Sequence, residues 1–374
     1  MTAGSADPKS QTVGNATVEN DAHAGTVQEK IVTSLFSIFM GRAPGPNEMT
    51  AITRLIVDLD SLPAVLERFA NTDEFKNRKS PAAQQKSTVP IFAPAGHFYS
   101  PVVDPTTLTS TITPSRQRRE PETLVGLDLD IAKMTQFWRD DLLPYAKDIP
   151  FADEPDGHHR YHYKNPAFSY GDGTVLYALL RRFKPKRVIE VGSGYSSACL
   201  LDASSGPGGF PCEITFIEPH PTLLKSLIRE DDIQRVTILE QGIQSVPLSC
   251  FETLEEGDFL FIDSTHVLKT GSDVAFELAE VLPLIKPGVF IHFHDIFYPF
   301  EYSHSWAVAE NRSWNEIYGL RAFLAFNKEF EVVFFNDMFL QLRVDVIKAD
   351  CPSFLKNSGG SIWLRRRGVS DGTR

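Results

Sequence analysis

The sequence predicts an α/β fold in which an open, doubly wound sheet of seven strands follows a small all-helical domain. Three observations support this prediction. From about residue 187 onward, short apolar runs alternate with segments of helical periodicity, as in stacked βαβ units. A glycine-rich turn directly follows the first apolar run, as in sheets that bind a ligand at their strand ends. Earlier in the chain, apolar residues recur four apart, which predicts helices.

Length and composition suit a globular protein of two domains. The chain has 374 residues, of which 42% are hydrophobic and 23% are charged, too many core formers for a disordered chain. Its net charge of −11 disfavours nucleic acid and anionic membrane surfaces as partners. The first residues lack the pattern of a secretory signal, and the cysteines include no Cys-x-x-Cys pair. We therefore expect a cytoplasmic protein that binds neither nucleic acid nor membrane.

Four segments are expected along the chain. They are a disordered leader, a helical domain, a proline-rich linker or wrapping arm, and the α/β domain, at residues 1–26, 27–79, 80–120 and 121–374. Residues 92–101 are too aromatic for a plain tether, so we expect them to dock on the α/β domain. His97 and Tyr99 in this stretch either make docking contacts or face a substrate.

Two short stretches of the helical domain match a known pattern. Phe39-Met40-Gly41-Arg42 and Thr72-Asp73-Glu74-Phe75 resemble the phycobilisome-linker-like domains of unknown function that bacteria append to enzymes. Such a domain could hold a protein partner or a second copy of the chain.

Strands of the α/β domain are predicted from apolar runs bounded by turn residues. They lie at residues 187–191, 214–217, 236–239, 259–262, 289–293, 331–335 and 361–365. Between the fourth and fifth strands, Val274, Leu278 and Val281 share one face of a predicted helix. A further helix is predicted around residues 314–326. The last two strands are close enough in the chain to pair antiparallel.

The turn after the first strand carries the strongest functional signal. Gly192 and Gly194 permit a tight turn and a close backbone approach to a ligand, and Ser196 or Ser197 can cap the next helix. A nicotinamide-binding turn would have glycine or alanine where this chain has Ser197. Glu190, at the entrance of the turn, can accept the cationic amino group of S-adenosylmethionine, which a dinucleotide does not offer there.

A second acidic residue, Glu218, ends the second strand. A carboxylate at this position can accept hydrogen bonds from both hydroxyls of a ribose. After the third strand, Gln241-Gly242-Ile243 lies where an adenine ring would, with Ile243 offering an apolar face. The series predicts a pocket for S-adenosylmethionine.

With these residues, the chain from about 90 to 366 resembles the class I S-adenosylmethionine-dependent methyltransferases. The other stretches that carry the resemblance are residues 165–172 (Asn-Pro-Ala-Phe-Ser-Tyr-Gly-Asp), 263–266 (Asp-Ser-Thr-His) and 291–297. It implies a Rossmann-like methyltransferase sheet and an activity of EC 2.1.1 type. The candidate cofactor residues are Glu190, Gly192, Ser193, Gly194, Ser196, Glu218, Gln241, Gly242, Ile243, Asp263 and Tyr170.

Acidic and imidazole side chains end the fourth and fifth strands. Because strand ends meet at one edge of such a sheet, Asp263, His294 and Asp295 are expected to converge. These ligand types suit Mg²⁺, Mn²⁺ or Fe²⁺. The resemblance to metal-dependent O-methyltransferases makes Asp263 and Asp295 metal ligands, but His294 stands where those enzymes commonly have a carboxylate, which favours a softer ion than magnesium. Alternatively, the aspartates only bond backbone and cofactor while the histidines pack.

A candidate catalytic base follows the fourth strand. His266 lies three residues beyond Asp263, the offset at which catechol-type members of the family have a lysine that takes the proton from the acceptor hydroxyl. A histidine that titrates near neutral pH is a competent general base, so His266 and Asp263 are the candidate catalytic residues. The alternative is a loop histidine that only forms hydrogen bonds. His292, inside the fifth strand, is expected to be a packed, satisfied histidine.

An aromatic run follows the fifth strand. Phe297, Tyr298, Phe300, Tyr302 and Trp306 either roof a substrate pocket or pack on themselves.

The expected reaction is methyl transfer from S-adenosylmethionine to a hydroxyl. The acceptor would be a small molecule or glycan, such as a sugar or another natural product, with assistance from a divalent metal (Mg, Mn or Fe). Two alternatives stay open. One is a methyltransferase-fold binding or scaffolding module without turnover, and the other is an NAD-dependent oxidoreductase.

Overall fold

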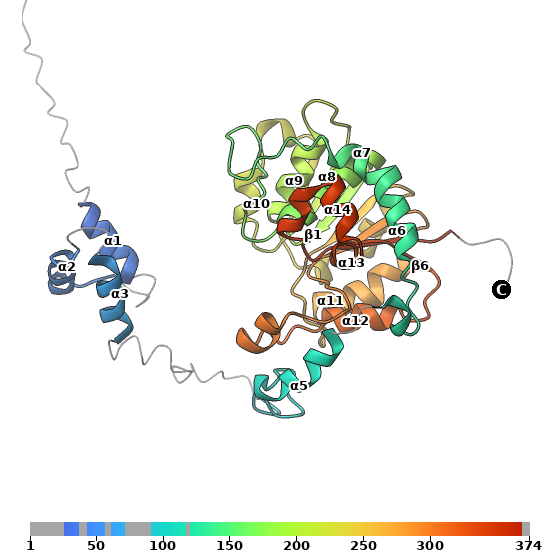
Figure 1. The fold of residues 1–374 in the computed structure, drawn as a ribbon. Coiled ribbons are helices and arrows are strands. Elements are labelled where there is room, and N and C mark those ends of the chain that lie inside the picture. The colour runs from blue at the N-terminus through green and yellow to red at the C-terminus, as the bar shows by residue number, and fades with distance from the viewer. Residues whose placement is uncertain (1–25, 37–42, 57–60, 72–90, 117–119, 369–374) are drawn as a thin grey trace, which may run out of the picture. The chain divides into compact units, whose positions relative to one another are not determined.

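The chain divides into two compact units, Met1–Ile91 and Phe92–Arg374, in a computed structural model (Figure 1). The structure describes residues 26–36, 43–56, 61–71, 91–116 and 120–368. The leader and much of the linker predicted from composition lie outside these residues, as do the stretches 39–42 and 72–75.

The described part of the first unit is helical, as predicted. Its helices are α1 (Val27–Leu35), α2 (Pro46–Thr53) and α3 (Leu62–Asn71). Thr26 caps α1, because its Oγ1 accepts the Glu29 N–H at 3.2 Å while the Glu29 carboxylate accepts the Thr26 N–H at 2.7 Å. The helices bury a small apolar cluster made of Val32, Leu35, Phe36, Ile56 and Val65.

The second unit begins with an arm, residues 92–116, that includes helix α5 (Pro105–Arg116). The aromatic rings of this stretch do not make the expected contact, because Phe92, Phe98 and Tyr99 are 89%, 82% and 66% exposed and lie tilted against one another. The contact with the rest of the unit comes later in the arm. There the Val103 N–H donates to Ser313 Oγ at 3.2 Å.

Seven strands in the described chain form one sheet. They are β1 (Arg187–Val191), β2 (Glu213–Ile217), β3 (Val236–Leu239), β4 (Phe259–Ile262), β5 (Phe290–Phe293), β6 (Phe330–Phe335) and β7 (Ile362–Arg366). Their order is β3-β2-β1-β4-β5-β7-β6. Strand β7 runs antiparallel to both β5 and β6, and the other pairs are parallel. The strand positions and the antiparallel last pair agree with the sequence prediction.

Helices flank the sheet along the chain. They are α6 (Ile131–Phe137), α7 (Leu143–Ala146), α8 (Tyr170–Phe183), α9 (Tyr195–Ser204), α10 (Thr222–Leu227), α11 (Asp273–Phe276), α12 (Glu316–Leu324), α13 (Asn336–Leu342) and α14 (Val344–Asp350). The helix predicted between β4 and β5 is short, because α11 passes into a π-helical turn (Glu277–Val281) and then a 3₁₀ turn (Leu282–Leu284). None of the helices in the described ranges has the length and apolar character needed to span a bilayer.

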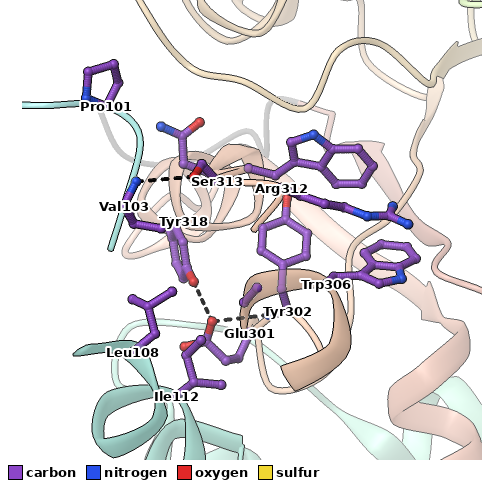
Figure 2. Close-up of a pocket in the computed structure, with 13 residues that line it drawn as sticks. Pro101, Val103, Leu108, Ile112, Glu301, Tyr302, Trp306, Arg312, Ser313 and Tyr318 are labelled. Atoms are coloured by element: carbon purple, nitrogen blue, oxygen red, sulfur yellow. Dashed lines mark hydrogen bonds between the residues drawn. The ribbon is translucent and has the colours of Figure 1, made fainter. Parts of the chain in front are cut away.

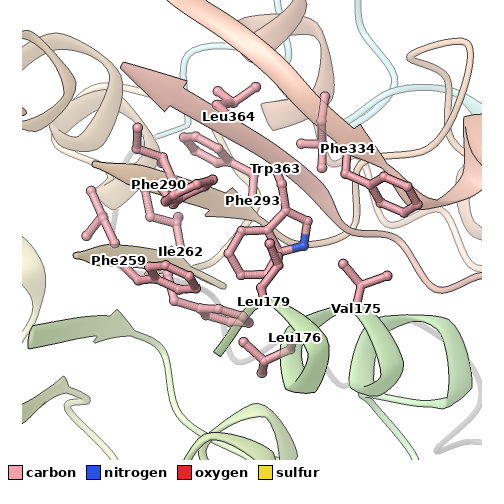
Figure 3. Close-up of a cluster of buried hydrophobic side chains, with 14 of the residues drawn as sticks. Val175, Leu176, Leu179, Phe259, Ile262, Phe290, Phe293, Phe334, Trp363 and Leu364 are labelled. Atoms are coloured by element: carbon pink, nitrogen blue, oxygen red, sulfur yellow. The ribbon is translucent and has the colours of Figure 1, made fainter. Parts of the chain in front are cut away.

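The core lies between the sheet and helix α8. Figure 3 shows Val175 and Leu179 of α8 beside Trp363 of β7. The Trp363 ring packs edge-on against Phe259 of β4, at 5.7 Å between centroids, and the indole is fully buried. These large side chains hold the antiparallel strand in register beside the parallel ones.

The topology also places the ligand crevice. From β1 the chain proceeds to β2 and β3 on one side of the sheet, whereas β4 leads to β5 on the other. Ligands of open α/β sheets bind outside the carboxyl ends of strands at such a switch point. The site is therefore expected where β1 and β4 end.

Candidate functional site

The glycine turn after β1 contacts the end of β4. Gly192 has a φ of +78°, and a Cβ on it would lie 1.8 Å from the Asp263 carbonyl oxygen, so this position requires glycine. A Cβ on Gly194 would meet nothing within 4 Å, so this residue borders open space. Of the two candidate capping serines, Ser197 acts, since its Oγ accepts the Gly194 N–H at 3.1 Å.

Glu190 lies beneath this turn with a buried carboxylate. The Ser196 hydroxyl donates to its Oε1 at 2.5 Å, while Oε2 is buried without a hydrogen-bond partner. Burial raises the pKa of Glu190 to about 8, against the opposing effect of hydrogen bonds from Ser196 and Ser197. An unpartnered buried carboxylate oxygen is costly unless a ligand supplies the donor, and a cationic amino group fits that need.

Glu218 lies just past the end of the neighbouring strand β2. Its Oε2 accepts the Ser193 N–H at 3.0 Å, and its Oε1 accepts the His220 N–H at 2.7 Å. These backbone donors hold the carboxylate in place and leave each oxygen able to accept a second hydrogen bond. The geometry fits the two hydroxyls of a ribose. The predicted cofactor residues Glu190, Gly192, Ser193, Gly194, Ser196 and Glu218 thus form one group around the turn.

The remaining predicted cofactor residues make contacts with other parts of the protein. Ile243 is 2% exposed and packs in the core, and Gln241 Nε2 donates to the Ser245 carbonyl at 3.2 Å. Gly242 is half-buried beside them. Tyr170 stacks on Tyr163 at 4.9 Å between ring centroids. The assignment of these residues to the cofactor stays a prediction.

Four side chains meet where β4 and β5 end. The His266 Nε2 atom lies 3.5 Å from Asp263 Oδ1 and 3.4 Å from Asp295 Oδ2. His294 Nε2 lies 3.5 Å from the other Asp295 oxygen. His266 and Asp295 have φ values of 61° and 56°, a left-handed backbone conformation that is unusual outside glycine and that turns both residues toward the shared space.

This donor set does not fit the predicted metal centre. The His266 ring nitrogen lies between the two aspartates, in the space that a bridging cation would need. Across the described ranges, no three His, Cys, Asp or Glu side chains are arranged to hold a metal ion. In this arrangement Asp263, His294 and Asp295 do not form a metal site, and their assignment as metal ligands stays a prediction.

A buried glutamate that the sequence prediction missed orients His266. The His266 Nδ1 atom lies 2.7 Å from Glu316 Oε2, and both residues are buried, at 6% and 1% exposure. Burial by itself would lower the pKa of His266, but Asp263 and Glu316 raise it well above its usual value. For Asp263 the two effects are reversed. Burial by itself would raise its pKa, but His294 and His266 lower it to about 2. Asp263 and His266 form an ion pair in which the histidine is buried and the aspartate is half-buried.

His292 is packed, as predicted, and stacks on His294 at 5.8 Å between ring centroids, but its Nδ1 atom has no hydrogen-bond partner. It is fully buried in β5, and its Nε2 lies 2.8 Å from Ser361 Oγ. Burial lowers its pKa well below the usual value. The aromatic run is divided between the two roles considered for it, because Tyr298 and Phe300 are buried in the core whereas Trp306 borders a cavity.

Comparisons with known proteins agree with this arrangement. Residues 189–296 match the family model of a methyltransferase domain. An uncharacterized protein from Archaeoglobus fulgidus is 29% identical over 173 residues, which cover 44% of this chain and 74% of that protein.

Two bacterial O-methyltransferases are among the solved structures with some similarity to this chain. TomG from Streptomyces achromogenes, in complex with SAM, is 16% identical with a TM-score of 0.37, over 69% of this chain and 99% of that one. An O-methyltransferase from Bacillus cereus, in complex with SAH, is 16% identical with a TM-score of 0.33, over 71% of this chain and 100% of that one. Neither likeness is close enough to transfer an activity to this chain.

The matched segment begins within β1 and ends just past Asp295, so it includes the glycine turn, Glu218 and the group around His266. The strand order, with β7 inserted antiparallel between β5 and β6, fits the seven-stranded doubly wound sheet predicted from the sequence. Residues 189–296, from within β1 to just past β5, are thus similar to a methyltransferase domain.

Proposed function

We propose that this protein transfers a methyl group from S-adenosylmethionine to a hydroxyl of a small molecule. The observation that carries the proposal is the unpartnered, buried Oε2 of Glu190 beneath the glycine turn. The amino group of S-adenosylmethionine would supply its missing donor. Glu218, held by two backbone N–H groups, would accept the ribose hydroxyls.

The chain's own residues would bind the acceptor, align it and remove its proton. S-adenosylmethionine, when bound, supplies a methyl group already activated by the sulfonium charge. Glu316 fixes the His266 ring through Nδ1, so that Nε2 faces the space beside Asp263. An acceptor hydroxyl bound there would pass its proton to Nε2, in the role of a general base.

The electrostatics of the site predict how this step depends on pH. Because the pKa of His266 is raised well above its usual value, the ring is a positively charged imidazolium at neutral pH in the free protein. Only the deprotonated ring can act as a base. Methyl transfer should therefore become faster as the pH rises above 7, until the ring is fully deprotonated.

Calorimetry with S-adenosylhomocysteine tests the cofactor assignment. The wild-type chain should bind it, and Glu218→Gln should weaken binding by about tenfold, since one charge-assisted pair of hydrogen bonds is lost. Glu240→Gln is the matched control, because Glu240 is an exposed glutamate after β3 that pairs with Lys225. If the wild type does not bind S-adenosylhomocysteine, or binds NADH tightly instead, the proposed function is wrong. Binding without methyl transfer to any hydroxyl would favour a scaffolding module.

A further inference from the structure

A cavity of about 360 Å³ lies between the arm and residues 301–318, which lead from the region after β5 into the first turn of α12 (Figure 2). Its size falls within the range of about 300 to 1,000 Å³ that small-molecule sites occupy. Every residue that lines it lies outside 189–296, the segment matched by the methyltransferase family model. The cavity is therefore built by parts of the chain that the domain match does not include.

The arm contributes an apolar wall. Val103, Leu108 and Ile112 face the cavity, and Figure 2 shows Leu108 and Ile112 on helix α5 beside Glu301. The arm is fixed at this place by the Val103 backbone, whose N–H donates to Ser313 Oγ at 3.2 Å and whose carbonyl accepts from Asn311 Nδ2 at 3.4 Å.

The opposite wall is aromatic, and its charged groups already have partners. The aromatic lining residues are Tyr302, Trp306, Trp314 and Tyr318. The guanidinium of Arg312 lies over the Trp306 ring at 3.8 Å and pairs with the Glu310 carboxylate at 2.7 Å. Glu301 accepts hydrogen bonds from the Tyr318 hydroxyl and the Tyr302 N–H.

These walls favour an apolar ligand over a sugar. A sugar has hydroxyls on every side, and each one that enters the cavity would exchange water for a lining that is mainly hydrocarbon. An apolar ring system gains free energy from the same transfer, at roughly 25 cal/mol per Å² of surface buried.

The cavity adjoins the proposed base. Trp314 lines the cavity, and its ring also packs against His266 at 4.5 Å between centroids. The next two residues, Asn315 and Glu316, donate their N–H groups to the His266 carbonyl at 3.0 and 3.1 Å. One short segment therefore forms both the cavity wall and the support of the base.

We infer that this cavity binds the apolar, ring-containing body of the methyl acceptor and that the arm determines which acceptor fits. The inference rests on the proposed function. It assigns the acceptor to hydroxyl-bearing molecules with a mainly apolar ring system and not to free sugars. Val103 and Leu108 are then specificity-determining residues from outside the sheet.

Calorimetry on the full chain tests the inference with 2-naphthol as an apolar probe and methyl α-glucoside as a polar one. The wild type should bind 2-naphthol at least tenfold more tightly than the glucoside. Leu108→Trp fills the cavity with apolar bulk, and Val103→Asp places a charge in it, so each should weaken 2-naphthol binding at least tenfold. Val344→Asp is the matched control, because Val344 is 52% exposed at the start of α14.

Affinity for S-adenosylhomocysteine, measured on the same samples, separates the two proposals. It should be unchanged in all three variants, which also shows that each has folded. Equal binding of the two probes, or 2-naphthol binding that neither cavity variant weakens, would overturn the cavity inference while leaving the cofactor assignment standing. Cavity-dependent binding of 2-naphthol by a chain that does not bind S-adenosylhomocysteine would overturn the acceptor assignment together with the proposed function.

Discussion

Glu190 is unfavourable to ionise in the free protein, because its carboxylate is buried and one of its oxygens has no hydrogen-bond partner. Its pKa is raised from 4.5 to about 8, so the folded protein favours the protonated form. The tighter binding of this proton in the folded protein adds to the free energy of unfolding. That contribution is present in full below about pH 4.5 and is lost as the pH rises through 8. The free protein should therefore be least stable in the alkaline range, where the cofactor's amino group would compensate the charge.

Glu190→Gln removes this buried charge without changing the side-chain size. We expect the variant to be more stable than the wild type at pH 9, by roughly 2 to 5 kcal/mol in urea unfolding, and similar to it at pH 4.5. The same substitution should weaken binding of S-adenosylhomocysteine at least tenfold, since the partner of its amino group is lost. Equal stability of the two proteins at pH 9 would contradict the assignment of a buried charge.

Glu316 sets the charge state of His266 through the 2.7 Å contact with Nδ1. Glu316→Gln keeps a hydrogen-bonding group but removes the negative charge. The pH midpoint of the His266 Cε1–H resonance should then fall by about 1 to 3 pH units. His266→Gln identifies the resonance by its disappearance. A midpoint that does not move would show that Glu316 and His266 do not interact in solution.

At the scale of elements, the glycine turn joins β1 to β4. Gly192→Ala would force a Cβ against the Asp263 carbonyl, so we expect a loss of roughly 2 to 4 kcal/mol of stability in urea unfolding. Gly194→Ala is the contrasting change, because its Cβ points into open space. It should unfold like the wild type yet bind S-adenosylhomocysteine more weakly, since the methyl group would lie on the ligand side. Similar stability losses in the two variants would mean that the turn does not have this shape.

The same elements show what a sequence can predict. The strand at 259–262 was predictable because a parallel strand buried on both faces is a continuous apolar run, here Phe-Leu-Phe-Ile. The glycine turn and Glu218 follow from the requirements of one ligand. Glu316 was not predictable, because a glutamate at the start of a helix is ordinarily a solvated charge, and only the fold brings it to a histidine fifty residues earlier.

The arrangement at the predicted metal site could not be foreseen for a related reason. The types of side chain at the ends of β4 and β5 were those of a metal site, but the direction of the His266 ring depends on its left-handed backbone and on Glu316. Neither this backbone conformation nor the contact with Glu316 can be predicted from the sequence. Likewise, the arm was expected to dock through its aromatic rings, yet it docks through Val103 and the backbone around it.

For the whole molecule, the two units have separate apolar cores that share no residue. A chain that begins at Phe92 should therefore fold alone. We expect its melting temperature to match that of the second unit in the full chain within about 2 °C, and its affinity for S-adenosylhomocysteine to be unchanged. Calorimetry on both chains checks this, and loss of cofactor binding in the shorter chain would show that the first unit completes the site.

The proposed cofactor residues and the cavity walls come from different segments of the chain, and this separation has an evolutionary consequence. The proposed cofactor residues, apart from Tyr170, come from residues 189–296, whereas the cavity walls come from the arm and from residues 301–318. Mutations in these outer segments can remodel the proposed acceptor site while leaving the proposed methyl-donor site intact. Descendants of one ancestor that share this domain should therefore diversify in what they methylate far sooner than in how they hold the donor.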